Sequence, residues 1–386
     1  MTFLKSGWSD ARAVFLGAVV GAVGARVDGA TSDWPMHRGN PHLNGVSSMA
    51  APASPKLEWS FVAGKPIKGG AAIASGRIFV GDDAGIVHAL YLSSGKEIWS
   101  FKTEGAVEAT PLVLGTQVIV GSSDGKLYCL DSESGTLTWH YETGDKILGG
   151  ANTAKSPDGT ADWILVGGYD SNLHCVDAST GKGIWKAATD NYINGTPALL
   201  PEGEVIFGGC DAILRVVSLK DGQALRQIES DAYVASSVAV ADDGMAYVGH
   251  YGNVVMGLNP KTATVLWRYR DRNFPYLSSA AVSSDRVVIG GNDKRLHCLN
   301  RADGTMLWQV STRGKIDGSP VICGDAVIVG SLDGRIYCVS MKDGSERWTY
   351  ELGAPVVASP AVSDGWIIIG AEDGSVYGLH SNPSKP

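Results

Sequence analysis

Short apolar runs recur along the whole chain, and each run is bounded by glycine, aspartate or serine. Within residues 319–350, for example, four such runs occupy 319–322, 326–330, 335–339 and 346–350. Short runs separated by turn residues favour β-strands, and no window shows sustained helical periodicity. The pattern therefore predicts an all-β chain.

The strands belong to a repeated unit, which reads GSSDGKLYCLD at 121–131 and GSLDGRIYCVS at 330–340. Eight units open at glycines that are spaced 40, 46, 41, 41, 41, 40 and 40 residues apart: Gly81, Gly121, Gly167, Gly208, Gly249, Gly290, Gly330 and Gly370. The longest spacing contains an insertion around 156–162. Four short strands in a period of about 40 residues are typical of a propeller blade. The repeat predicts an eight-bladed β-propeller of four-stranded blades over residues 57–380.

The two ends of the repeat are complementary. The last unit has three strands and no fourth, whereas 57–61 near the N-terminus is a fourth strand without a unit. We expect this strand to complete the eighth blade, because closure leaves no unpaired strand edge. Residues 31–56 then lead into the propeller, and 381–386 form a C-terminal tail.

One tryptophan stands at the same place in the fourth strand of most units. These residues are Trp59, Trp99, Trp139, Trp185, Trp267, Trp308 and Trp348, and Arg226 takes the remaining place. An indole at a repeated position can bury a large area between blades while its N–H finds a backbone acceptor. We interpret the seven tryptophans as blade-docking residues and not as a ligand cage.

Four of the six cysteines share one position of the third strand in different units: Cys129, Cys175, Cys298 and Cys338. Equivalent points on neighbouring blades lie beyond the Cα separation of about 7 Å that a disulfide allows. These four are therefore predicted to be free, buried thiols. Cys210 and Cys323 stand at other positions, and the sequence does not decide whether they pair.

An aspartate fills the fourth place of six units: Asp124, Asp170, Asp211, Asp293, Asp333 and Asp373. Glycine follows in three of them, as tight hairpin turns require. Calcium binding is the alternative, but one carboxylate per blade falls short of the six to eight oxygens that calcium takes. His88, His174 and His297 stand where other units have tyrosine, which favours a half-exposed packing position over metal ligation.

The N-terminus has the pattern of an export signal. Lys5 and Arg12 precede an apolar stretch at 13–25 that is too short to cross a bilayer. We predict a signal peptide over residues 1–30, cleaved after Ala25 or Ala30; a retained anchor or a cytoplasmic leader is the alternative. The mature chain is then a periplasmic or extracellular monomer without a transmembrane span.

A formal net charge of −8 and the lack of any run of lysine or arginine argue against nucleic acid as a partner. The sequence also has none of the local patterns of known catalytic sites, such as HExxH, GxSxG or a phosphate loop. Neither a catalytic residue nor a metal site is predicted.

The residues just before the first strand of each unit should ring the mouth of the central channel. In a four-stranded blade, the link from one blade to the next lies on the same face as the turn between the second and third strands. The ring reads Lys68, Glu108, Leu148, Asn194, Ala235, Leu277, Asp317 and Val357. Its polar members Lys68, Glu108, Asn194 and Asp317 are the predicted ligand or partner contacts.

The link after Trp267 is the most distinctive, because it interleaves arginines with aromatic residues. Arginine and aromatic side chains are enriched at interface hot spots. We predict a binding patch that contains Arg270, Arg272, Phe274 and Tyr276; solvated arginines beside a packed loop are the alternative.

The phrases SGKEIW, STGKGIW and DGSERW, together with VIVGSSDGKLYCLD, resemble the repeats of the pyrroloquinoline quinone (PQQ)-like propellers over residues 57–380. The segment 33–47, with WPMHRG and GVS, is similar to the segment that precedes such propellers in exported bacterial proteins. This resemblance implies the fold, whereas function depends on the site.

Two branches of that family are relevant. Quinoprotein alcohol dehydrogenases hold PQQ and calcium with a vicinal disulfide, a Glu/Asn calcium pair and an aspartate base, but no two cysteines are adjacent here and no segment matches those ligand motifs. The other branch resembles the propeller lipoprotein of the outer-membrane β-barrel assembly machinery, an eight-bladed scaffold without a cofactor. The first cysteine here is Cys129, so no lipid-bearing cysteine follows the signal.

We therefore predict an exported, non-catalytic propeller that serves as a scaffold and binds a protein partner in the cell envelope, with no cofactor. The alternatives are a quinoprotein dehydrogenase that uses PQQ with calcium, and a propeller that binds a small ligand or a polysaccharide.

Overall fold

The computed structural model describes residues 33–381. The predicted signal peptide at 1–30 and nearly all of the predicted tail at 381–386 lie outside the described residues. Within 33–381, no helix is long and apolar enough to cross a membrane.

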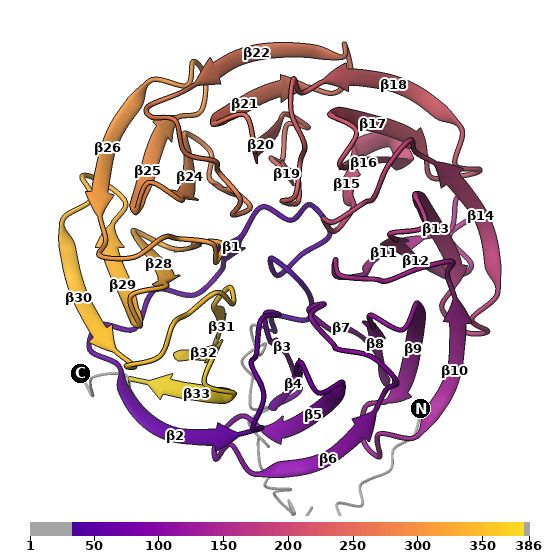
Figure 1. Ribbon diagram of the computed structural model, residues 1–386, viewed down its shortest axis with the longest axis horizontal. Helices are drawn as coiled ribbons and strands as arrows, with labels where there is room; N and C mark the ends of the chain where they lie inside the picture. The colour runs from indigo at the N-terminus through magenta and orange to yellow at the C-terminus, as the bar shows by residue number, and fades with distance from the viewer. Residues whose placement is uncertain (1–32, 382–386) are drawn as a thin grey trace, which may run out of the picture. The chain divides into compact units, whose positions relative to one another are not determined.

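Eight sheets, each built on four antiparallel strands, stand around a central channel (Figure 1), as the repeat predicted. Blades one to four contain, in order, β3 (Ala72–Ala74), β4 (Arg77–Gly81), β5 (Ile86–Tyr91) and β6 (Glu97–Lys102); β7 (Leu112–Leu114), β8 (Gln117–Gly121), β9 (Lys126–Asp131) and β10 (Leu137–Glu142); β11 (Asn152–Lys155), β12 (Asp162–Gly167), β13 (Asn172–Asp177) and β14 (Gly183–Ala188); and β15 (Ala198–Leu200), β16 (Glu204–Gly208), β17 (Ile213–Ser218) and β18 (Ala224–Glu229).

Blades five to eight contain β19 (Ala239–Val240), β20 (Ala246–His250), β21 (Val254–Asn259) and β22 (Thr264–Tyr269); β23 (Ala281–Val282), β24 (Arg286–Gly291), β25 (Arg295–Asn300) and β26 (Met306–Ser311); β27 (Val321–Cys323), β28 (Ala326–Ser331), β29 (Arg335–Ser340) and β30 (Glu346–Glu351); and β31 (Ala361–Ser363), β32 (Trp366–Gly370), β33 (Ser375–His380) and β2 (Lys56–Val62). The remaining elements of the described chain are β1 (Val46–Ser47) and one 3₁₀ turn, η1 (Pro201–Gly203).

The N-terminal strand β2 closes the ring. It pairs antiparallel with β33, with Trp59 opposite Gly378, so the first and last parts of the propeller share one sheet. Figure 1 shows the indigo β2 beside the yellow β33. The predicted closure is confirmed.

Burial explains the two kinds of strand pattern. The second strands, such as β8, are covered on both faces by neighbouring blades and are continuous apolar runs. The outer strands, such as β10, have one face toward solvent and alternate between exposed and covered side chains. The chain thus forms strands of both kinds from one repeated pattern.

The indoles join the outer strands to the next blade. Each of the seven donates its N–H to a backbone carbonyl about one unit further along the ring; Trp308, for example, donates to the carbonyl of Met341 at 3.0 Å. The eighth place uses a different donor, because the guanidinium Nε of Arg226 donates to the carbonyl of Pro260 at 2.8 Å. The contact is therefore kept in all eight blades.

The indole also explains the small residue of the third strand. Trp308 pairs with Cys298 in the sheet, and Trp267 pairs with Gly257, where an added Cβ would lie 2.3 Å from the indole ring. All six cysteines are free; Cys210 is half-buried and the others are buried. This confirms the prediction for the four repeated thiols and shows that Cys210 and Cys323 do not pair.

A second inter-blade contact involves the glycine that opens each unit. A Cβ on Gly81 would lie 2.0 Å from Val107, and one on Gly290 would lie 2.2 Å from Ile316. Val107 and Ile316 belong to the links to the next blades and are fully buried. The glycine is required because an apolar side chain of the next blade occupies the space where a Cβ would be.

Residues 33–47, here called the axial segment, run through the channel (Figure 1). Backbone N–H groups on the first strands of six blades donate to its carbonyls: Ile73 to Trp34, Val113 to Pro35, Leu199 to Pro41, Val240 to His42, Val282 to Asn44 and Ile322 to Gly45. The side chain of Asn152 donates to Pro41 from another blade. Strand β1 extends blade seven by pairing parallel with β27. The segment thus contacts blades one to seven.

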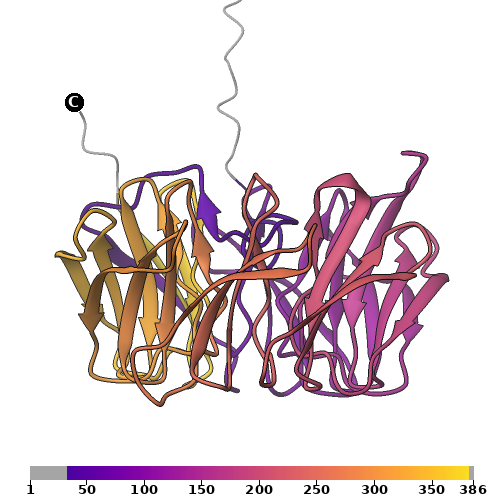
Figure 2. The ribbon, with the colours of Figure 1, turned by 90° about the horizontal axis from the view of Figure 1, so that it is seen from above.

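The axial segment also fills the channel with side chains. Trp34, Met36 and Leu43 are buried, and Arg38 is buried as well, with its Nη2 donating to the carbonyl of Ala280 at 2.9 Å. In Figure 2 the indigo segment with β1 lies near the upper face of the ring. One end of the channel is therefore closed by the chain itself.

Removing the axial segment should destabilise the propeller. A chain that starts at Ser48 loses six carbonyl acceptors and three large buried apolar side chains, at about 1.5–3 kcal/mol for each of these side chains. We expect a clearly lower urea midpoint and melting temperature than for a chain that starts at Asp33. Equal midpoints for the two chains would contradict a structural role of this segment.

Truncation of an outer-strand indole should lower the free energy of unfolding more than truncation of the Arg226 side chain. Trp308→Ala removes a buried ring and its hydrogen bond and should cost roughly 3–5 kcal/mol of unfolding free energy. Arg226→Ala removes a charged donor and the ion pair with Glu204, for which we expect about 1.5–3 kcal/mol. Denaturant melts of both variants test this order, and a larger loss for Arg226→Ala would contradict it.

Candidate functional site: the channel mouth

The links between blades and the turns between second and third strands build one face of the ring. In blade one, the N–H of Asp83 in such a turn donates to the carbonyl of Pro66 in the link at 3.0 Å. The same bond recurs in blade five, from Tyr251 to Tyr233, at 3.0 Å. This face, called the mouth face, surrounds the open end of the channel.

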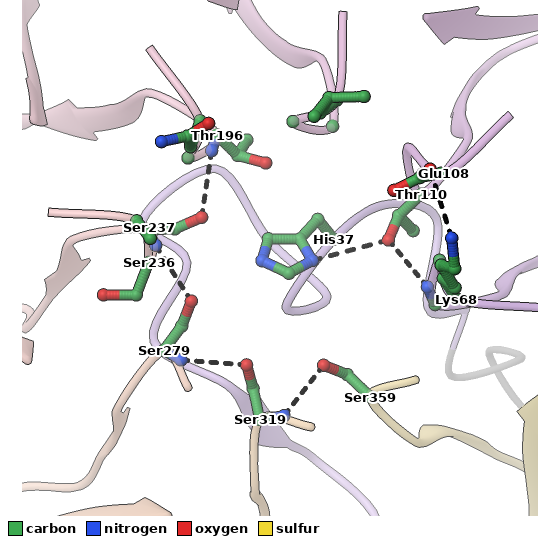
Figure 3. A pocket seen from close by; sticks show the side chains of 18 of the residues that line it. His37, Lys68, Glu108, Thr110, Thr196, Ser236, Ser237, Ser279, Ser319 and Ser359 are labelled. Atoms are coloured by element: carbon green, nitrogen blue, oxygen red, sulfur yellow. Dashed lines mark hydrogen bonds and ion pairs between the residues drawn. The ribbon is translucent and has the colours of Figure 1, made fainter. Parts of the chain in front are cut away.

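A pocket of about 170 Å³ occupies the mouth. The four polar residues predicted to ring the channel, Lys68, Glu108, Asn194 and Asp317, all line it, together with His37 of the axial segment. Figure 3 shows His37 near the middle of a ring of hydroxyl side chains. The structure therefore brings these four residues to one site.

The hydroxyl groups form a belt around the pocket. Within it, a backbone N–H of one blade donates to a hydroxyl of the next, as from Ser279 to Ser319 at 2.9 Å and from Ser319 to Ser359 at 3.0 Å. The same bond joins Gly70 to Thr110, Thr196 to Ser237 and Ser237 to Ser279. The pocket wall is thus rich in neutral oxygen atoms.

Lys68 is held by two carboxylates. Its ammonium lies 2.8 Å from Asp83 and 3.3 Å from Glu108. The hydrogen bond to Asp83 is the main cause that raises the pKa of Lys68. The single cationic side chain of the pocket lining is therefore already paired.

Asp317 is the carboxylate without such a partner. One of its oxygens is buried and has no hydrogen-bond partner among the described residues. Burial raises the pKa of Asp317, and Glu372 adds to the rise while Lys315 opposes it. Asn194 is instead engaged with the half-buried thiol of Cys210, at 2.9 Å from its amide nitrogen.

His37 is neutral at the bottom of the pocket. Burial in the channel, with a smaller contribution from Arg38, lowers the pKa of His37 to about 3. Its Nδ1 lies 3.5 Å from the hydroxyl of Thr110, beyond the usual reach for catalytic proton transfer. The imidazole therefore adds no positive charge to the site.

The distinctive link after Trp267 contains both exposed and buried side chains. Arg270, Arg272 and Phe274 are exposed, and Arg270 donates to the carbonyl of Gly252 at 2.9 Å. Tyr276 is only 2% exposed and packs over Gly249, where an added Cβ would lie 2.6 Å from it. The expected role of Tyr276 as a partner contact is thus corrected: it is the docking side chain of this link, equivalent to Val107 and Ile316.

Three further aromatic residues on the mouth face were not predicted from the sequence. Tyr192, Tyr233 and Tyr251 are 44%, 54% and 50% exposed, and Phe274 is 46% exposed. They belong to the links and turns of blades four to six, and Tyr192 stacks on Tyr169 at 4.6 Å. We call these four exposed residues the aromatic arc. Alignment of the links would have found two of them, because Tyr192 and Tyr233 stand two residues before the mouth residue.

The turn aspartates and the third-strand rings form another repeated contact. Asp124 accepts hydrogen bonds from the hydroxyl of Tyr128 at 2.8 Å and from the backbone N–H of Glu104 at 2.9 Å. His174 and His297 bond to the equivalent aspartates Asp170 and Asp293, and His88 bonds to Asp82, which directly follows the opening glycine of its unit. These three histidines are buried, which corrects the expectation of half-exposed positions, since the ring must reach the aspartate beneath the link.

One group of potential metal ligands occurs within 33–381: Asp271, Asp293 and His297. The group already has internal partners, because His297 bonds to Asp293 at 3.2 Å and Arg295 pairs with Asp271 at 3.3 Å. It is one instance of the repeated aspartate–ring contact. We assign no ion to it.

The mouth does not fit PQQ with calcium. Calcium needs six to eight converging oxygens, but Glu108 on blade two is paired with Lys68 and Asp317 lies on blade seven. No group of three or more histidine, cysteine or carboxylate ligands gathers in the pocket among residues 33–381. We therefore give this cofactor no part in the function proposed below.

The fold and the mouth define a PQQ-like β-propeller with a polar axial pocket. The chain belongs to the family described as outer membrane protein assembly factor BamB, whose model matches residues 44–161, 154–315 and 292–382. No curated protein matches the chain.

Solved structures show the same fold at low identity. BamB from Moraxella catarrhalis has 18% identity and a TM-score of 0.69 over 85% of this chain and 100% of that one. Quinohemoprotein alcohol dehydrogenase from Comamonas testosteroni has 14% identity and a TM-score of 0.79 over 92% of this chain and 82% of that one. The computationally designed Ika8 protein has 16% identity and a TM-score of 0.72 over 84% of this chain and 98% of that one. Because these proteins differ so widely, the likeness establishes the fold alone.

Asp317 should weaken the fold at neutral pH. Its pKa is higher in the folded chain than in the unfolded chain, so its ionisation favours unfolding at pH values above the folded pKa. We expect Asp317→Asn to melt at a higher temperature than the parent at about pH 7, and the difference to vanish near pH 3, where both states are protonated.

Asp303 is the matched control, because hydrogen bonds from Thr305 lower its pKa. Asp303→Asn should therefore lower the melting temperature at neutral pH, with the difference vanishing as the pH falls through the lowered pKa. The same sign for both variants would contradict the assignment of Asp317.

Proposed function

We propose that this chain is an exported, non-catalytic scaffold of the cell envelope that binds a protein partner in outer-membrane protein assembly. Membership in the BamB family supports a role in outer-membrane protein assembly. The main observation in favour of partner binding is the aromatic arc. Four large aromatic side chains, each about half exposed, lie on one side of one face. Clustered exposed apolar groups of this kind are typical of protein-binding sites.

The composition of the arc fits a protein interface. Tyrosine offers a rigid contact area at a low cost in side-chain entropy and can still hydrogen-bond at its rim. Arg270 and Arg272 lie in the same link as Phe274, and arginine is the other residue type that often dominates binding energy. The arc and these arginines together form the proposed docking surface.

The chemistry of the pocket supports a scaffold over an enzyme. Five hydroxyls of the belt accept backbone N–H groups, and His37 with a pKa of about 3 is a weak base at neutral pH. A nucleophile activated by a neighbouring base is not found in the described lining. We accordingly expect no cofactor to be needed.

Replacing the arc should abolish partner capture without unfolding the chain. We expect the fourfold variant Tyr192→Ala, Tyr233→Ala, Tyr251→Ala and Phe274→Ala to lose at least about tenfold in affinity for an outer-membrane assembly component, since hot-spot truncations cost about 1.4 kcal/mol or more each. Quantitative co-purification from envelope extracts, with melting temperatures measured in parallel, tests this.

Tyr91→Ala is the matched control. Tyr91 is 49% exposed but ends strand β5, on the face opposite the mouth. Capture should be unchanged in this variant. Equal capture by all variants would contradict the proposal, and a rise in melting temperature with PQQ plus calcium, lost in Glu108→Ala, would favour a quinoprotein instead. Arc-dependent retention on a polysaccharide resin with no protein partner would favour the carbohydrate alternative.

A further inference from the structure

The mouth pocket has an excess of acidic groups. Three carboxylates, Asp83, Glu108 and Asp317, stand at or beside it, against the single ammonium of Lys68. Asp83 and Glu108 both contact that ammonium. Asp317 stands apart on blade seven and forms no ion pair within the described chain, although the charge of Lys315 acts on it without direct contact.

The rest of the lining suits a positively charged group. The hydroxyls of the belt and of Ser236 offer oxygen lone pairs, and Ser236 directs its own proton to the carbonyl of Gly249 at 3.1 Å. His37 is neutral and adds no repulsion. An ammonium or guanidinium carries only donors, which these oxygens can accept.

Size and shape restrict the ligand further. A space of about 170 Å³ is enough for the end of one side chain. A bare divalent ion would need several converging carboxylates, and the lining supplies Asp317 alone as an unpaired one. The tyrosines of the arc stand beside the mouth, and their ring faces also attract cations.

We propose that the mouth pocket binds the cationic end of a lysine or arginine side chain, with Asp317 as its counter-charge. This proposal rests on the proposed function, because it names the group that a protein partner inserts while the aromatic arc holds the surface around it. The cation replaces water around a carboxylate that the fold itself leaves unpaired. Such charge-assisted hydrogen bonds are stronger than neutral ones.

The test uses the full chain and small probes that carry one side chain each. We expect Nα-acetyl-lysinamide or Nα-acetyl-argininamide to bind with one-to-one stoichiometry below about 20 mM, as followed by NMR titration or calorimetry. Nα-acetyl-glutaminamide, the corresponding glutamate amide and calcium chloride should show no saturable binding. The lysine and arginine arms show whether an ammonium or a guanidinium is preferred.

Asp317→Asn should weaken binding of the cationic probe at least about tenfold, because it removes the counter-charge and keeps the shape. Asp145→Asn is the matched control: it makes the same change at an exposed position in the link between blades two and three, on the same face and outside the lining. This variant should bind the probe within about twofold of the parent, since exposed charges are screened. Melting temperatures verify that both variants are folded.

Three outcomes overturn the inference: no saturable binding of either cationic probe, equal binding by Asp317→Asn, or calcium binding that Asp317→Asn abolishes. If the probes fail while partner capture still depends on the aromatic arc, the pocket assignment is wrong and the scaffold function stands. If replacement of the arc leaves capture unchanged, the scaffold function fails whatever the probes show.

Discussion

The docking of each blade onto the next is the constraint on which the rest of the structure depends. Three contacts make it, from the rim of the ring inward. At the rim, an outer-strand indole or the Arg226 guanidinium donates to a carbonyl of the next blade. Further in, an apolar link residue packs over the opening glycine, and around the channel hydroxyls accept backbone N–H groups. Each contact is local and repeated, so a 40-residue unit specifies a ring once eight copies are joined and strand β2 removes the last edge.

Positions outside these contacts are free to differ from blade to blade, and the polar residues at the channel mouth and the aromatic arc are among them. On the mouth face, blades four to six carry Tyr192, Tyr233, Tyr251 and Phe274, whereas blades seven, eight, one and two have charged residues such as Lys315, Glu372, Asp83 and Glu108 there and none of these exposed aromatic rings. A symmetric frame thus presents an asymmetric surface. Specific recognition needs such asymmetry, because eight identical edges would offer a partner no single register.

The axial segment gives the channel a direction. Trp34, Met36 and Leu43 fill one end, and the other end remains as a shallow pocket with neutral His37 at its bottom. The channel is therefore a cup that opens on the mouth face. The polar residues that ring it therefore lie on one face, next to the aromatic arc, instead of lining a pore.

The sequence alone determined the features that repeat: eight blades, four strands in each, closure by residues 57–61 and the positions of the docking tryptophans. Repetition makes these visible, since each unit predicts its neighbours. Tertiary structure decided what depends on a single contact. The aromatic side chain of Tyr276, beside arginines, predicted an interface residue, but in the folded chain it packs over Gly249 and is buried. Segment 33–47 has no repeat partner, so only the folded chain shows that it closes the channel. Likewise, only the folded chain shows that Lys68 pairs with Asp83 and Glu108, whereas Asp317, two blades away around the ring, forms no ion pair among the described residues.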